Sequence, residues 1–361
     1  SKYPMINLSI GAPNRPTPAW IIEAMKTHLD NPAYHTYPPQ HGAPELCEAV
    51  AYWYGKRFGV EIDPKDNVLI TVGIKEAIFN ALHSLVNAGD VVMVPDPGYP
   101  TYFEAVLFTG GKLLTYNSDA EADEVLSEIE HKARLHGPKI VIVNYPSNPT
   151  GRIVGLDFYK SLSEIASRYD FAVMSDLAYS EIAFDGLTVH SYLQARPGLE
   201  LGFEYFAFSK TYNMAGWRVG AIVGDKRLVD SVKLYKSKID SNVFYPIQQA
   251  AVTALKETPD SFYRELSGMY QQRRDALVHG LSDIGLRFSP PQGAMYTWVE
   301  TPEGVDPWFF TEKLYKEYGI LVVPGTAYGL NGSHRVRMGL VQETSLMEEA
   351  ARRLAEGGLL R

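Results

Sequence analysis

The sequence Phe206-Ala207-Phe208-Ser209-Lys210-Thr211-Tyr212-Asn213-Met214-Ala215-Gly216-Trp217-Arg218-Val219-Gly220 joins two short apolar runs. A lysine at the end of a buried strand is costly unless its charge is used or its pKa is lowered. Arg218 follows Lys210 in the same stretch, and a guanidinium is a fixed partner for a phosphate dianion. An amine beside a phosphate clamp meets both requirements of pyridoxal phosphate, which needs one group for a Schiff base and one for its phosphate. For this stretch alone, the alternative is an ordinary surface lysine and arginine on a loop.

Length and composition limit the class of protein. The chain has 361 residues, 45% of them hydrophobic, which suffices for one large or two medium domains. A net charge of −8 without a basic block argues against nucleic acid or an anionic membrane as a partner. The single cysteine, Cys47, excludes an internal disulfide framework and a cysteine-based metal cage, and we expect no metal. Because no long apolar run is present and Ser1 to Pro4 show no secretory pattern, we expect a cytoplasmic protein with no transmembrane helix.

Short apolar runs alternate with longer amphipathic ones, which predicts an α/β fold with a mostly parallel sheet. Strands are expected at 68–72, 91–94, 140–143, 172–175, 205–208 and 219–223, and helices at 45–58, 76–86, 158–168, 246–256 and 261–281. After about residue 255, short runs at 288–291, 295–299, 321–323 and 335–340 follow the long helix, which predicts a smaller α+β domain. We therefore expect a large domain of residues 36–254 and a small domain of residues 1–35 plus 255–361.

Polar residues follow several of the expected strands, at the edge where open α/β sheets bind ligands. Asp176 follows the apolar run 171–175, and Tyr179 comes three residues later. Asn148 stands in Asn144-Tyr145-Pro146-Ser147-Asn148-Pro149-Thr150-Gly151, Gly73 joins a strand to a helix, and Tyr99 lies between Gly98 and Pro100. Taken singly, these residues are explained as well or better by caps and turns.

The order and spacing of these residues resemble the fold-type I, class I/II aminotransferases over nearly the whole chain. The stretches most similar to the LL-diaminopimelate aminotransferase-related subgroup are Gly73-Ile74-Lys75-Glu76, Asp96-Pro97-Gly98-Tyr99-Pro100, Asn144 to Gly151, and Ser209 to Gly220. The spacing from Lys210 to Arg218, with its flanking glycines, is the specific signal. The resemblance implies an aspartate aminotransferase-like fold. Its large domain, with a mostly parallel seven-stranded sheet flanked by helices, would bind pyridoxal 5′-phosphate beside a smaller α+β domain.

The resemblance also implies roles for the matching residues. Lys210 would form the Schiff base and then move the proton, while Asp176 would pair with the pyridine nitrogen. Asn148 and Tyr179 would hydrogen-bond the ring 3-oxygen, and Tyr99 would stack on the ring. The remaining cofactor-binding residues implied are Gly73, Ile74, Lys75, Ser209, Arg218, Asn242 and Tyr37 of the partner subunit. A tyrosine that reaches the neighbour's phosphate implies a homodimer.

For the substrate, Arg337 matches the family arginine that grips the α-carboxylate, with the backbone of Gly11 and Ala12 closing over the same group. Arg335 shares one face of the expected strand with Arg337, so the two compete, and the resemblance favours Arg337. Ala207 and Ile74 replace residues that often supply phosphate hydroxyls in the family, each worth ~1 kcal/mol. We hypothesise that Lys75 compensates electrostatically.

The predicted function is transfer of an amino group from an L-amino acid to a 2-oxo acid, expected to be 2-oxoglutarate, by a ping-pong mechanism. The alternatives are a C–S β-lyase on the same fold and a non-catalytic regulatory protein that binds pyridoxal phosphate. A Rossmann dehydrogenase is disfavoured because no Gly-x-Gly-x-x-Gly follows the first strand. The amino donor stays open. Candidates near the mouth of the site are Tyr34, His35, Lys236 and Lys238, although solvated helix lysines are the simpler interpretation of the last two.

Overall fold

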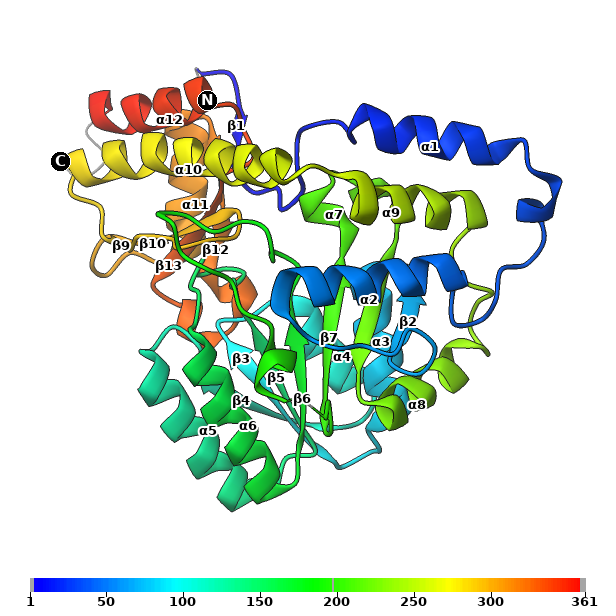
Figure 1. The fold of residues 1–361 in the computed structure, drawn as a ribbon. Helices are drawn as coiled ribbons and strands as arrows, with labels where there is room; N and C mark the ends of the chain where they lie inside the picture. Colours follow the sequence, from blue (N-terminus) through cyan, green and yellow to red (C-terminus); the bar gives the residue numbers. More distant parts are fainter. Residues whose placement is uncertain (1–2, 197, 358–361) are drawn as a thin grey trace.

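A seven-stranded sheet forms the centre of the computed structural model, which describes residues 3–196 and 198–357 (Figure 1). Ser1 and Lys2, part of the N-terminal stretch considered above, lie outside the described residues. In spatial order the strands are β2 (Val68–Thr71), β8 (Gly220–Gly224), β7 (Gly202–Ala207), β6 (Ala172–Asp176), β5 (Ile140–Asn144), β3 (Val91–Asp96) and β4 (Lys112–Asn117). Strand β8 is antiparallel to both of its neighbours, and the other pairs are parallel. The predicted mostly parallel seven-stranded sheet is therefore confirmed.

Both faces of this sheet are buried except at the edge strand β4, which explains why the other strands contain continuous apolar runs. Along β2, Val68 and Ile70 enter one core and Leu69 enters the other. The first core lies under α2 (Pro44–Phe58), α5 (Ala122–His136), α6 (Leu156–Tyr169) and α9 (Tyr245–Glu257). The second lies under α3 (Gly73–Leu85), α4 (Pro100–Phe108) and α8 (Lys226–Lys236), and Figure 1 shows α2 in front of the sheet with α3 and α4 behind it.

The C-terminal part builds a smaller layer with its own core. Its four-stranded antiparallel sheet has the order β12 (Val323–Pro324), β13 (Arg335–Gly339), β10 (Tyr296–Glu300) and β9 (Phe288–Ser289). The helices α10 (Asp260–Asp283), α11 (Pro307–Tyr318) and α12 (Thr344–Glu356) contribute to the same core. This arrangement matches the smaller α+β unit expected after residue 255.

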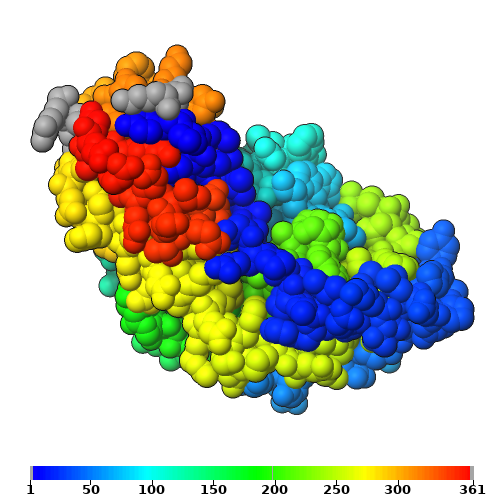
Figure 2. Space-filling view, turned by 90° about the horizontal axis from the view of Figure 1, so that it is seen from above, coloured from blue at the N-terminus to red at the C-terminus, as the bar shows by residue number. Residues whose placement is uncertain are grey.

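The N-terminal segment contacts both layers. Strand β1 (Ile6–Asn7) pairs with β11 (Ile320–Leu321) of the small layer. Helix α1 (Ala19–Leu29) packs against α9, and Figure 2 shows the blue N-terminal segment passing from the red C-terminal helix to the yellow region beyond it. The division into residues 36–254 and 1–35 plus 255–361 stays a proposal, and both α1 and the 3-10 turn Pro32–His35 contact α9 of the large layer.

The expected element boundaries differ from the observed ones at a few places. Strand β7 begins at Gly202 and ends at Ala207 instead of covering 205–208, because Phe208 already begins the short helix α7 (Phe208–Thr211). The run expected at 321–323 is divided between β11 and β12, and β4 was not predicted. Within the described ranges, no helix is both long and apolar enough to cross a membrane.

Candidate active site

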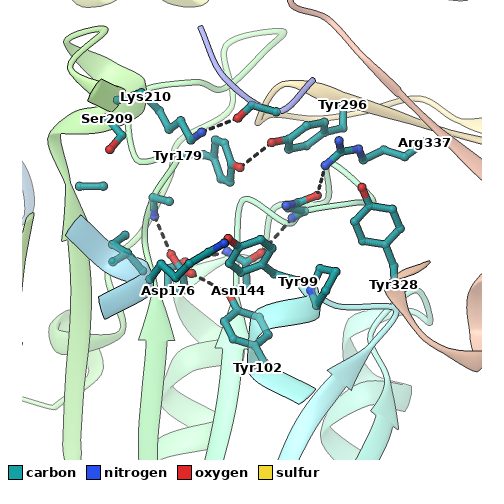
Figure 3. Close-up of a pocket in the computed structure, with 18 of the residues that line it drawn as sticks. Tyr99, Tyr102, Asn144, Asp176, Tyr179, Ser209, Lys210, Tyr296, Tyr328 and Arg337 are labelled. Carbon is teal, nitrogen blue, oxygen red and sulfur yellow. Dashed lines mark hydrogen bonds between the residues drawn. The ribbon is translucent and has the colours of Figure 1, made fainter. Parts of the chain in front are cut away.

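A cavity of about 580 Å³ lies where the two layers meet, at the carboxyl ends of the sheet strands (Figure 3). The large layer contributes residues at the ends of β5, β6 and β7 and at the starts of α3 and α4. The small layer contributes Tyr296 and Arg337 from neighbouring strands, together with Tyr328, and the N-terminal segment contributes Ser9 and Gly11. Of the sequence-predicted site residues, those lining this cavity are Gly11, Ile74, Lys75, Tyr99, Asn148, Asp176, Tyr179, Ser209, Lys210, Arg218 and Arg337.

Lys210 reaches the cavity from the one-turn helix α7, which follows directly on β7. Strand β7 places the backbone of α7 at the edge of the sheet, and the helical turn directs the Lys210 side chain into the cavity. The Lys210 amine donates a hydrogen bond to the carbonyl oxygen of Gly11, and Figure 3 shows it at one side of the cavity. Among the described residues the amine has no other hydrogen bond, so it is available to react with a carbonyl compound in the cavity.

Asp176 lies at the end of β6 and is 4% exposed. One carboxylate oxygen accepts a hydrogen bond of 2.6 Å from the Tyr102 hydroxyl, and the other accepts one of 3.0 Å from the backbone N–H of Ala178. Burial raises the pKa of Asp176 to about 6, against the opposing effects of these hydrogen bonds and of Lys210. A buried carboxylate facing a cavity is suited to pair with a cationic ring nitrogen.

This raised pKa predicts a pH-dependent stability for the cofactor-free protein. The unfolded state ionises Asp176 first, so the stability contributed by its neutral form is present at low pH and is lost as the pH rises through about 6. The loss amounts to about 3 kcal/mol. In Asp176→Asn, we expect a smaller decline in the free energy of unfolding between about pH 4 and pH 7, measured by urea titration without cofactor. An identical decline in both proteins would contradict the assignment.

Asn148 and Tyr179 flank the same space. Asn144, at the end of β5, accepts a hydrogen bond from the Asn148 backbone and donates one of 2.9 Å to the carbonyl oxygen of Asp176. The hydroxyls of Tyr179 and Tyr296 are 2.8 Å apart. Burial, and then the neighbouring Tyr296, raises the pKa of Tyr179 well above its usual value. Tyr179 is therefore a neutral hydrogen-bond donor in this environment.

The start of α3 and Arg218 form a cationic turn at another side of the cavity. Gly73 has a φ of +77°, and a Cβ atom there would lie 2.5 Å from the Arg218 Nη2. Glycine therefore allows the guanidinium to approach the backbone closely. Ile74 and Lys75 follow at the first turn of the helix, where free N–H groups attract an anion. The four residues 72–75, which we call the α3 turn, together with Arg218 suit a phosphate.

Ile74, in the α3 turn, and Ala207, at the end of β7, both line the cavity. The Lys75 ammonium lies 6.0 Å from the centre of the Tyr99 ring. For Lys75→Ala we expect about 10-fold weaker binding of pyridoxal phosphate, because one cation near the phosphate is lost. Equilibrium titration of the cofactor-free protein measures this, and unchanged affinity would refute compensation by Lys75. Pyridoxal, which has no phosphate, serves as the control ligand.

Arg337 and Arg335 have different environments although they share a face of β13. The Arg337 guanidinium donates to Asn148 Oδ1 at 3.0 Å and to the carbonyl oxygen of Ser9 at 2.7 Å. It lies between the rings of Tyr296 and Tyr328, at 4.2 and 5.0 Å from their centres. Its buried Nε has no hydrogen-bond partner among the described residues. Arg335 lies outside this cavity and pairs with Glu300 at 3.2 Å and with Asp119 at 3.5 Å.

This cavity therefore combines a free amine, a buried carboxylate, a turn suited to a phosphate and an arginine with an unused donor. The family model described as aminotransferase class I and II matches residues 3–354. The chain belongs to the class I and II aminotransferases. Members of this family use pyridoxal phosphate attached to a lysine as a Schiff base, and the cofactor supplies an electron sink that makes the α-proton of an amino acid acidic.

Relatives of this aminotransferase cover nearly all of its length. A protein named LL-diaminopimelate aminotransferase from Desulforudis audaxviator is 40% identical over 354 residues, which are 97% of this chain and 89% of the relative. LL-diaminopimelate aminotransferase 2 from a Nostoc species is 36% identical, covering 98% and 91%. The crystal structure of an aromatic aminotransferase from Pyrococcus horikoshii has a TM-score of 0.91 at 29% identity, covering 99% and 97%.

Four sequence-predicted residues of the aminotransferase lie outside the lining of this cavity. Gly73 packs closely against the Arg218 guanidinium, and Ala12 follows the lining residue Gly11 in the chain. Tyr37 is 86% exposed, and Asn242 donates a hydrogen bond of 2.9 Å to the carbonyl oxygen of Gln40. Within one chain, then, Tyr37 and Asn242 lie near the same surface segment and not in the cavity.

The candidates for the mouth of the site need one correction. Lys236 is not a solvated helix lysine, because its side chain is 1% exposed and pairs with Glu76 and Asp240. Lys238 is exposed. Tyr34 stacks on Tyr245 with ring centres 4.4 Å apart, and His35 contacts the carbonyl oxygen of Leu29 at 2.9 Å.

Sequence reasoning missed three tyrosines of the aminotransferase cavity. Tyr102 binds Asp176, Tyr296 contacts both Tyr179 and Arg337, and Tyr328 covers Arg337. The only signal for Tyr102 was its place one helical turn after Tyr99. Tyr296 and Tyr328 belong to the small layer. Their positions in the sequence do not indicate that they lie close to the strand ends of the large layer.

Proposed function

We propose that Lys210 carries the cofactor in this aminotransferase and moves the proton during the exchange of an amino group between an L-amino acid and a 2-oxo acid. The observation that carries the proposal is the convergence of Lys210, Asp176 and Arg337 on one cavity. Asp176 would pair with the ring nitrogen, and the α3 turn with Arg218 would hold the phosphate. Tyr99 would stack on the ring, and Ser209 would contribute to the same binding surface.

On the substrate side, Arg337 binds the α-carboxylate. Its guanidinium lines the cavity between two aromatic rings, and a guanidinium can hold a carboxylate through two parallel N–H groups. Lys210 then holds or releases a proton at the α-carbon, where its amine is oriented by the Gly11 carbonyl. Asn148 and Tyr179 would hydrogen-bond the 3-oxygen of the cofactor ring.

For the amino donor we propose LL-diaminopimelate, with 2-oxoglutarate as the acceptor. The support is the name shared by relatives that are 36–40% identical over nearly the whole chain. The test mixes the purified enzyme with a panel of amino acids and follows the visible absorbance of the bound cofactor. We expect LL-diaminopimelate to change the spectrum and glutamate to be formed from 2-oxoglutarate. A panel in which no donor changes the spectrum would reject transamination by this site, and release of pyruvate and a thiol would identify a lyase.

The proposal includes a homodimer in the cytoplasm. Tyr37 is 86% exposed within one chain, which supports a neighbour that covers it, and it would then contact the partner's phosphate as the family resemblance implies. The buried free thiol of Cys47 is compatible with a reducing compartment. Sedimentation of the cofactor-loaded enzyme as a monomer would contradict the role of Tyr37.

A further inference from the structure

Lys236 is a buried cation outside the active-site cavity. It lies at the end of α8, and its side chain is 1% exposed. Its ammonium donates hydrogen bonds of 2.6 and 2.7 Å to the two carboxylate oxygens of Asp240 and one of 3.0 Å to Glu76 Oε1. Lysine is rarely buried unless it is paired, so these contacts explain its position but not its purpose.

Through Glu76, this cation reaches the α3 turn. The second carboxylate oxygen of Glu76 accepts a hydrogen bond of 3.0 Å from the backbone N–H of Val72. The carbonyl of the same Val72 faces the Arg218 guanidinium at 3.4 Å. Val72 is thus held on one side by Glu76 and on the other by Arg218, and it leads directly into Gly73.

Through Asp240, the same cation reaches the segment that carries Tyr37. Asp240 Oδ1 accepts a hydrogen bond of 2.7 Å from the backbone N–H of Asn242. Asn242, which has a φ of +73°, in turn donates to the carbonyl oxygen of Gln40. Lys236 therefore joins three segments that are distant in sequence, namely the start of α3, the end of α8 and the loop around residue 40.

We infer that Lys236 is a positioning residue for the cofactor phosphate, acting through Glu76 and Val72 on the α3 turn. The inference rests on the proposed placement of the phosphate at that turn. Without Lys236, the Glu76 carboxylate would lose its cation within one helical turn of a phosphate dianion. Removing one partner of a buried ion pair leaves an uncompensated charge, and this charge would repel the phosphate. Lys236 thus fixes the geometry of the turn and compensates part of the negative charge of the two carboxylates that it binds, Glu76 and Asp240.

The test compares two ligands on the cofactor-free protein. In Lys236→Met, affinity for pyridoxal phosphate should fall about 10-fold or more, whereas affinity for pyridoxal should stay within about 2-fold of the wild type. Lys238→Met, a change at the exposed lysine two residues away, should alter neither affinity. Equal losses for both ligands would mean that Lys236 only maintains the fold, and unchanged affinity for pyridoxal phosphate would also overturn the inference.

A second variant covers the case in which Lys236→Met does not fold. The triple variant Glu76→Gln/Lys236→Met/Asp240→Asn removes all three charges of the cluster, and the two new amides still offer an oxygen to the backbone N–H groups of Val72 and Asn242. We expect it to fold and to regain most of the selectivity for pyridoxal phosphate over pyridoxal. Failure to regain it would reject the charge argument. The proposed function is tested separately by borohydride reduction of the wild-type protein, followed by mass analysis of its peptides. A cofactor attached to a residue other than Lys210 would refute the proposed function and leave the role of Lys236 unaffected.

Discussion

Replacing Lys210 with alanine is expected to lower kcat for transamination by at least about 10⁴-fold, because one change removes both the nucleophile and the proton carrier. The fold should tolerate the change, since Lys210 is only half-buried and donates to a single backbone carbonyl. Cofactor should still bind through the α3 turn, Arg218 and Asp176. Steady-state kinetics with a saturating amino donor measures the loss.

Two controls make this result specific. Adding a small primary amine such as methylamine should restore part of the activity of Lys210→Ala, because the missing base is replaced from solution. Replacement of the exposed Lys238 by alanine should leave kcat unchanged. Activity of Lys210→Ala above about 1% of the wild type would place the catalytic amine elsewhere.

The second large effect is expected at the substrate carboxylate. In Arg337→Gln, kcat/KM for the amino donor should fall about 100-fold, close to 3 kcal/mol, as is typical when one partner of a buried charge pair is removed. The change should appear mainly in KM if the contact is equally strong in the ground state and the transition state. Affinity for pyridoxal phosphate should change little, because Arg337 lies on the substrate side of the cavity.

Arg335→Gln provides a matched control on the same strand. Arg335 faces Glu300 and Asp119 outside the cavity, so its loss should change kcat/KM by less than about 3-fold. The reverse ranking of the two variants would assign the carboxylate to Arg335 and contradict the geometry of Arg337.

Apolar runs were sufficient to predict six of the seven strands of the central sheet, but not the edge strand β4. Strands β3, β5 and β6 are buried on both faces, so each begins with a run of apolar residues. Such runs predict the buried strands of an α/β fold. Strand β4 lies at the edge and carries Lys112, Thr115 and Asn117, which gave no comparable signal. Phe208 extended the apolar run of β7 by one residue, although its backbone already turns into the helix that carries Lys210.

For the site, sequence reasoning found residues that follow strands and missed those that depend on distant partners. Asp176 and Lys210 directly follow buried runs, and strand ends meet at one edge of a sheet. The burial of Lys236 was missed because Glu76, one of its two partners, is 160 positions away in the chain, and Asp240, four residues after it, is also consistent with an exposed pair. Likewise, alternation placed Arg335 and Arg337 on one face, but only the packing of the small layer on the large one separates their environments.

The N-terminal segment has a consequence for how this enzyme responds to genetic change. Its contacts with Lys210 and Arg337 are made by the main-chain oxygens of Gly11 and Ser9. Replacement of Ser9 leaves its oxygen in place, so a saturation mutagenesis screen should score this position as tolerant, whereas at Gly11 a Cβ atom would lie 2.8 Å from the Tyr296 hydroxyl. Deleting or inserting one residue upstream of Gly11 would instead shift both acceptors at once. Reading-frame-preserving indels should therefore show the role of the Ser9 oxygen, which substitutions at Ser9 leave in place.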